Sequence, residues 1–122
     1  MILGLDPGVT TGFAVLTVEG SLVLQGLIPL EHLTEAITRL IEMFHPVVVV
    51  VERLPAFKPT AAQVQVVSEV QSAIGFRRVE WVGPGEWKPM KADLINPLQG
   101  SHAADAVRMT AMWLRRNGVP MI

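Results

Sequence analysis

Residues 2–16 read ILGLDPGVTTGFAVL. They predict a short apolar strand over Ile2–Leu5 that ends on a carboxylate, Asp6, followed by a Pro-Gly turn and a second apolar strand. Aspartate is depleted inside strands, so one that follows a buried run is expected to have a chemical or a capping role. The pattern therefore places Asp6 at the carboxyl end of the first strand.

An aspartate and a glycine after a first strand are a weak signal when taken alone. Sugar-kinase and actin-like ATPases open in this way, and so do RNase H-like nucleases. The ATPases need two such domains around a nucleotide, whereas 122 residues are expected to form one domain, residues 1–122. Length therefore favours the nucleases.

Composition excludes several kinds of site. The chain has no cysteine, which excludes disulfides, thiolate metal sites and cysteine nucleophiles. No apolar run approaches the roughly 18 residues of a membrane span, and no basic segment precedes an apolar one as in a secretion signal. We therefore expect a soluble, cytoplasmic protein.

Charge gives no independent support for nucleic-acid binding. Ten Lys and Arg residues stand against eleven Asp and Glu, a net charge of −1, whereas DNA-binding proteins usually carry a basic excess. Most of the basic residues lie in the second half of the chain. That distribution is equally typical of solvated helix faces.

Apolar periodicity predicts five strands and three helices. Three consecutive strands are expected to form an antiparallel meander, and a wholly β-branched strand after the first helix is expected at the centre of the sheet. The fold class is thus α/β, an RNase H-like fold with a five-stranded mixed sheet flanked by helices. The predicted strands are Ile2–Leu5, Gly12–Val18, Leu22–Ile28, Val47–Val51 and Arg78–Val82, and the helices are Pro29–Phe44, Thr60–Ile74 and His102–Asn117.

In such a sheet the first and fourth strands lie side by side and parallel, which brings Asp6 and Glu52 together beyond their carboxyl ends. His102 and Asp105 stand three apart at the start of the last helix, on one helix face. Carboxylates and an imidazole that converge repel each other or shift each other's pKa unless a cation lies among them. Oxygen-rich ligands suit Mg²⁺ or Mn²⁺, and two such ions about 4 Å apart can promote phosphodiester hydrolysis.

Each of these residues also has a structural interpretation. Asp6 is able to cap the turn that follows it, and Asp105 is favoured by the dipole at a helix N-terminus. His102 is not, since a cation is disfavoured there. Glu52 at the end of a valine strand is harder to explain structurally, because an unpaired buried carboxylate is costly.

Four motifs together resemble RuvC-type Holliday junction resolvases. Residues 2–8, ILGLDPG, with Thr11-Gly12, are similar to the opening signature of that family. Residues 50–52, VVE, are similar to its second acidic strand end, and residues 102–106, HAADA, to its terminal motif. Residues 83–88, GPGEWK, resemble the stretch that brings a lysine towards the DNA. The motifs occur in family order along the whole chain.

The resemblance implies a homodimeric, metal-dependent endonuclease that nicks opposing strands of a four-way DNA junction. Its cofactor would be Mg²⁺ or Mn²⁺, two ions in each active site, and its reaction would be hydrolysis without a covalent enzyme intermediate. Lys88 would contact the scissile phosphate or the DNA backbone. The implied metal ligands are Asp6, Glu52, His102 and Asp105, with His102 either a ligand or a proton acceptor.

The resemblance is weaker for junction recognition. The chain is shorter than typical members, mostly between Lys88 and His102, and Lys91 is the only nearby substitute for the family's second lysine. Phe57 follows closely on the place where the family inserts an aromatic wedge, and it is able to stack on a base. Lys58 and Arg53 complete the expected DNA contacts.

In the family the helix after the second acidic residue forms the dimer interface, here Thr60–Ile74. Its apolar residues Val64, Val67, Val70 and Ile74 are expected on one helix face, a spacing that is more often an ordinary core stripe, so the dimer rests on the resemblance alone.

Three alternatives to a dedicated junction resolvase stay open. A nuclease of broader specificity would cut forks and flaps as well, and a YqgF-like enzyme of the same fold would process RNA. A non-catalytic DNA-binding scaffold would not require four intact ligand positions.

Overall fold

A computed structural model of the chain describes residues 1–8, 10–53, 61–75, 78–83 and 102–118. A single five-stranded sheet has the strand order β3-β2-β1-β4-β5. The strands are β1 (Ile2–Asp6), β2 (Thr10–Leu16), β3 (Leu22–Pro29), β4 (Val48–Glu52) and β5 (Val79–Val82), and the helices are η1 (Leu30–His32), α1 (Leu33–Phe44), α2 (Ala61–Ile74) and α4 (His102–Asn117).

The pairing of the strands confirms the predicted mixed sheet. β1 pairs antiparallel with β2, and β2 pairs antiparallel with β3. On its other side β1 pairs in parallel with β4, which itself pairs in parallel with β5. The first strand of the chain is thus the central strand of the sheet.

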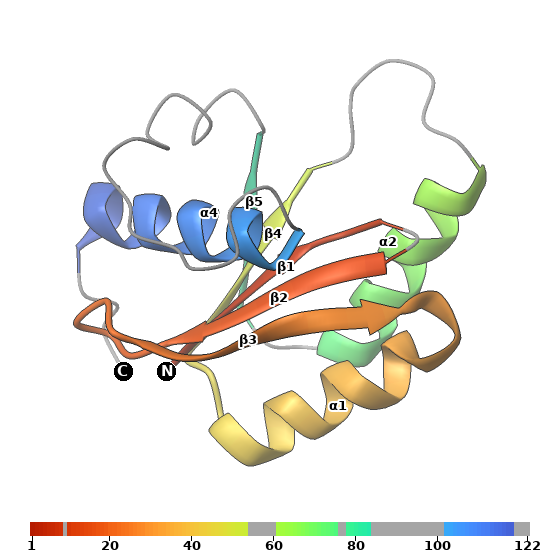
Figure 1. The fold of residues 1–122 in the computed structure, drawn as a ribbon, viewed down its shortest axis with the longest axis horizontal. Helices are drawn as coiled ribbons and strands as arrows, with labels where there is room; N and C mark the ends of the chain where they lie inside the picture. Colours follow the sequence, from red (N-terminus) through yellow and green to blue (C-terminus); the bar gives the residue numbers. More distant parts are fainter. Residues whose placement is uncertain (9, 54–60, 76–77, 84–101, 119–122) are drawn as a thin grey trace.

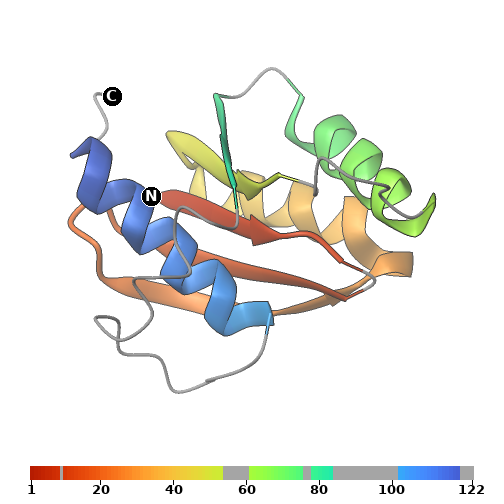
Figure 2. The same ribbon diagram turned by 90° about the horizontal axis from the view of Figure 1, so that it is seen from above.

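Helices cover both faces of the sheet (Figures 1 and 2). Leu3 and Leu5 of β1 point into a core shared with α1 and α2. Ile2 points to the opposite face, into a core built with Met109, Met112 and Trp113 of α4. Because successive side chains of a strand alternate between faces, Gly4 and Asp6 belong to the α4 face as well.

The helices end where the sequence predicts. His45 closes α1 in the left-handed conformation, with φ 46°, and its backbone N–H donates to the carbonyl of Ile41 at 2.9 Å. Gly75 and Gly118 end α2 and α4 at φ 65° and φ 74°, which a residue without a Cβ adopts readily. No helix in the described ranges is long and apolar enough to cross a membrane.

Three predictions need correction. The predicted first helix, Pro29–Phe44, begins too early, because Pro29 still pairs with Thr10 in the sheet and a 3-10 turn precedes the start of α1 at Leu33. The predicted second strand, Gly12–Val18, lies two residues too far along the chain, because the β2–β3 turn begins at Thr17, whose carbonyl accepts from the N–H of Gly20 at 2.9 Å. The predicted stripe on α2 is wrong in part, because the face that packs into the core carries Val66 with Val70 and Ile74, whereas Val64 is 49% exposed.

The distance between β1 and α4 is limited by Gly4. A Cβ on this residue would overlap the Oγ1 of Thr110 and approach the carbonyl oxygen of Ala106 at 3.2 Å. Thr110 is fully buried, and its hydroxyl donates to that same carbonyl at 2.6 Å. The helix therefore rests directly on the backbone of the central strand.

Gly4→Ala is expected to lower the free energy of unfolding by about 1–3 kcal/mol, because the added methyl forces α4 and β1 apart. Thr110→Ala in the same chain makes room for the methyl, so the double variant is expected to recover part of that loss. Urea denaturation of the single and double variants measures the coupling. Purely additive losses would contradict the proposed close approach.

Candidate active site

Asp6 and Glu52 end two neighbouring parallel strands. The printed register pairs Leu5 with Val51, so the next residues along β1 and β4 are Asp6 and Glu52. Asp6 is 6% exposed and Glu52 is partly buried. The register thus places both residues at the carboxyl ends of adjacent strands, and their meeting in one site stays a prediction.

Both carboxylates belong to the face of the sheet that α4 covers. Gly4, two residues before Asp6, lies against Thr110, and Val50, two residues before Glu52, packs in the core with Met109 and Met112. The period of two in a strand carries Asp6 and Glu52 to the same side.

The first turn of α4 supplies the third acidic residue. His102 begins the helix and Asp105 follows in its first turn, partly buried. Ala103, Ala104 and Ala106 are fully buried beside it, as predicted for a helix that approaches its sheet closely. The side chain of His102 lies outside what the structure describes.

Thr11 contributes hydrogen bonds to the turn that follows Asp6. The backbone N–H of Gly8 donates to the Oγ1 of Thr11 at 3.5 Å, and that hydroxyl donates to the Gly8 carbonyl at 3.3 Å. Thr11 is fully buried. The Thr11 side chain thus satisfies the backbone of Gly8 on both its N–H and its carbonyl.

Arg53 follows Glu52 directly and is exposed. Its backbone N–H donates to the carbonyl of Val82 at 2.8 Å, which continues the pairing of β4 with β5 by one residue. Its guanidinium lies over Gly83, where an added Cβ would meet Nη2 at 3.2 Å. The predicted DNA contact therefore lies beside the strand ends that carry the acidic residues.

Four predicted residues, Phe57, Lys58, Lys88 and Lys91, lie outside the described residues. Within the described ranges, no three His, Cys, Asp or Glu side chains are grouped closely enough to hold a metal ion. The described residues thus place Asp6 and Glu52 at the ends of neighbouring strands and Asp105 in the first turn of α4, and their side chains do not form a three-residue group.

Solved structures share this fold, although no family model and no curated protein sequence matches the chain. RuvC of T. thermophilus, solved in complex with a Holliday junction substrate, aligns with a TM-score of 0.77 at 19% identity, over 97% of this chain and 96% of that one. The chain has the RuvC fold. A second Thermus thermophilus RuvC structure aligns with a TM-score of 0.77 at 20% identity over the same shares. The Fowlpox virus resolvase, in complex with Holliday junction DNA, aligns at 0.64 with 11% identity, over 95% of this chain and 99% of that one.

The donor atoms at this end of the RuvC fold fit a hard divalent cation. Asp6, Glu52 and Asp105 offer carboxylate oxygens only, the ligand type that Mg²⁺ and Mn²⁺ prefer. Asp6 is buried, and burying a carboxylate is costly unless an opposite charge or hydrogen bonds compensate it. The residues present are therefore chemically suited to the metal, with His102 as the position from which a nitrogen ligand would come.

Sequence reasoning missed Arg108. This residue is 5% exposed, and its Nη1 donates to the Oδ1 of Asp105 at 3.3 Å, one helical turn away. An arginine within an otherwise apolar segment of the last helix, two residues after Ala106, was the available signal, because a charge on the buried side of a helix requires a partner.

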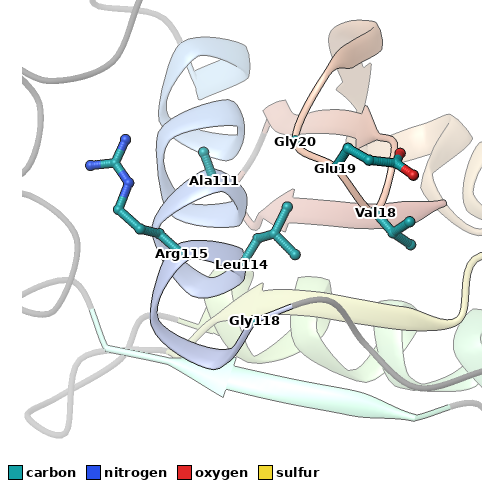
Figure 3. Close-up of a pocket in the computed structure, with 7 residues that line it drawn as sticks. All are labelled: Val18, Glu19, Gly20, Ala111, Leu114, Arg115 and Gly118. Atoms are coloured by element: carbon teal, nitrogen blue, oxygen red, sulfur yellow. The ribbon is translucent and has the colours of Figure 1, made fainter.

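A cavity of about 420 Å³ lies elsewhere, between the β2–β3 turn and the C-terminal end of α4. Figure 3 shows Arg115 extending away from Glu19, so the two charges do not converge on a ligand position. The cavity adjoins the end of α4 opposite to Asp105. It therefore does not contribute to the acidic site.

Asp105→Asn is expected to lower the free energy of unfolding by about 1–3 kcal/mol, because Arg108 then keeps a buried charge without its carboxylate. Adding Arg108→Met removes that charge and is expected to restore most of the loss. Thermal and urea unfolding in metal-free buffer measure both effects.

Glu35→Gln is the matched control, since the Glu35–Arg39 pair of α1 is exposed, 63% and 73% for the two side chains. Its effect is expected to stay within about 0.5 kcal/mol. Equal losses in Asp105→Asn and Glu35→Gln would contradict the stabilising role given to the buried pair.

Proposed function

We propose that the chain is a divalent-metal-dependent endonuclease that resolves four-way DNA junctions by paired nicks. The observation that carries the proposal is the position of Asp6 and Glu52 at the ends of two adjacent parallel strands, on the sheet face covered by the helix that carries Asp105. Support also comes from the RuvC and poxvirus resolvase structures of the same fold, both solved with Holliday junction DNA.

Asp6, Glu52, His102 and Asp105 would hold the cations. Two bound divalent ions would supply electrostatic stabilisation of the charge that develops on the phosphodiester. The burial of Asp6 holds its carboxylate in one place, which lowers the cost of orienting it during the reaction. His102 would serve as the fourth ligand or as the acceptor of a proton from the attacking water.

Basic residues around the strand ends would contact the DNA. Arg53 is exposed beside Glu52, where a guanidinium is able to reach a phosphate. Lys88 would contact the scissile phosphate, and Lys58 and Lys91 the backbone. Phe57 would stack on a base at the junction centre.

The proposed assembly is a homodimer through α2. Val64 is 49% exposed and Val67 partly exposed, on a side of the helix away from the buried Val66. Ser68 and Gln71 lie exposed beside them, a mixture of apolar and polar residues that is compatible with a subunit interface. A dimer would supply one active site for each of the two nicks.

Purified protein is expected to cut a labelled four-way junction in Mg²⁺ or Mn²⁺ and to release nicked duplexes. Asp6→Asn is expected to lower the cleavage rate by a factor on the order of 100 or more, because it removes a ligand charge from the site. Glu42→Gln, the same chemical change at an exposed position of α1, is the control and is expected to leave the rate unchanged.

Forked, flapped and linear DNA and a structured RNA belong in the same assay. Cleavage of every branched DNA would replace the junction resolvase by a nuclease of broader specificity, and cleavage of RNA alone would indicate RNA processing. No cleavage of any substrate in either metal would overturn the nuclease and favour a DNA-binding scaffold.

Val64→Glu is expected to convert the dimer to a monomer, because two like charges would meet across the two-fold axis of the interface. Sedimentation equilibrium measures the change. Met43→Glu is the control, since Met43 lies on α1 and is 68% exposed. A wild-type monomer at every concentration, or dissociation by Met43→Glu alone, would contradict an interface on α2.

A further inference from the structure

Arg108 and Asp6 are the two charged residues that are buried in the described part of the chain, and both lie on the α4 side of the sheet. A buried charge is costly unless it is paired. Asp6 already has a place in the proposed metal site. Arg108 therefore needs an explanation of its own.

The pair that Arg108 forms differs from an ordinary helix-surface pair. The side chains of Arg108 and Asp105 are 6% and 26% exposed, whereas those of Arg39 and Glu35 on α1 are 73% and 63% exposed. An exposed pair of this kind contributes little, because water screens it and the side chains lose freedom. The buried pair is screened less, so it holds its geometry more firmly.

Among the described residues, the guanidinium of Arg108 pairs with Asp105. Nη1 of Arg108 donates to Oδ1 of Asp105 at 3.3 Å, while its buried Nε has no hydrogen-bond partner among the residues that the structure describes. The arginine thus gives up hydration at Nε and keeps a directional bond to one oxygen of a single carboxylate.

We infer that Arg108 is a positioning residue for Asp105. Its N–H donates a hydrogen bond to Oδ1 and thereby limits rotation of the Asp105 carboxylate. Oδ2 is then the oxygen that a divalent cation would bind. Hydrogen bonds to a ligating carboxylate orient it in this way and commonly change metal affinity 10–100-fold when removed, on the order seen in metalloenzymes generally. The inference rests on the proposed metal site.

The charge of Arg108 and the geometry of its hydrogen bond have opposite effects on cation binding by Asp105. The positive charge of Arg108 opposes a cation at the same carboxylate, whereas the directional N–H favours cation binding by orienting that carboxylate. Arg108→Lys keeps the charge and loses the planar donor geometry, so it isolates the positioning role. Arg108→Met removes both and does not separate them.

The test is Mn²⁺ binding to the full chain, measured by titration calorimetry. Arg108→Lys is expected to weaken Mn²⁺ binding by about 10–100-fold. Arg39→Lys, the same change at the exposed arginine of α1, is the control and is expected to bind as the wild type does. An Arg108→Lys variant that folds and binds Mn²⁺ within about twofold of the wild type would overturn the positioning role.

Asp6→Asn separates failure of this inference from failure of the proposed function. Suppose that the wild type and Arg108→Lys both bind Mn²⁺ and Asp6→Asn does not. That result would support the metal site and contradict only the role of Arg108. If the wild type itself binds no Mn²⁺, then the proposed metal site falls and the positioning role with it.

A second measurement uses the wild type alone and does not depend on a variant that folds. In ¹⁵N spectra of the arginine side chains, the Arg108 guanidinium is expected to rotate slowly before and after Mg²⁺ is added. Fast rotation on addition of Mg²⁺ would mean that the cation and the arginine compete for Asp105, and it would overturn the inference.

Discussion

The parallel pairing of β1 with β4 is the constraint on which the rest of the site depends. Two strands that run in the same direction end at the same edge of the sheet, so the residues that follow their apolar runs meet there whatever lies between them in sequence. Leu5 pairs with Val51, and Asp6 and Glu52 come next. An antiparallel pairing would have placed these carboxylates at opposite ends of the molecule.

The second constraint is the height of α4 above the sheet. Gly4 has no side chain, and Thr110 occupies the space that a methyl group there would need. The fully buried alanines around Asp105 lie in the first turn of the same helix. Small residues on both elements thus allow α4 to lie directly against β1, and larger ones would hold the helix farther from the sheet.

The charged residues at the strand ends and in the first two turns of α4 are buried to different extents. Asp6 and Arg108 are buried, whereas Glu52 and Asp105 are partly buried. Arg108 contacts Asp105 and so places a permanent positive charge beside the acidic residues. Because the interior screens charges weakly, the cation affinity proposed for these residues would depend on the balance between the carboxylates and that arginine.

The sequence by itself determined the order of the elements and the ends of α1, α2 and α4, because apolar periodicity and helix-ending residues act locally. It also placed Asp6 and Glu52 at the ends of their strands. It also determined the mixed sheet, since an antiparallel meander followed by a β-branched central strand has few other solutions. Only the tertiary structure decided which valines of α2 enter the core and that Arg108 is buried against Asp105. Those outcomes depend on which face of each helix the sheet covers, and a helical repeat with apolar residues on more than one side leaves that choice to packing.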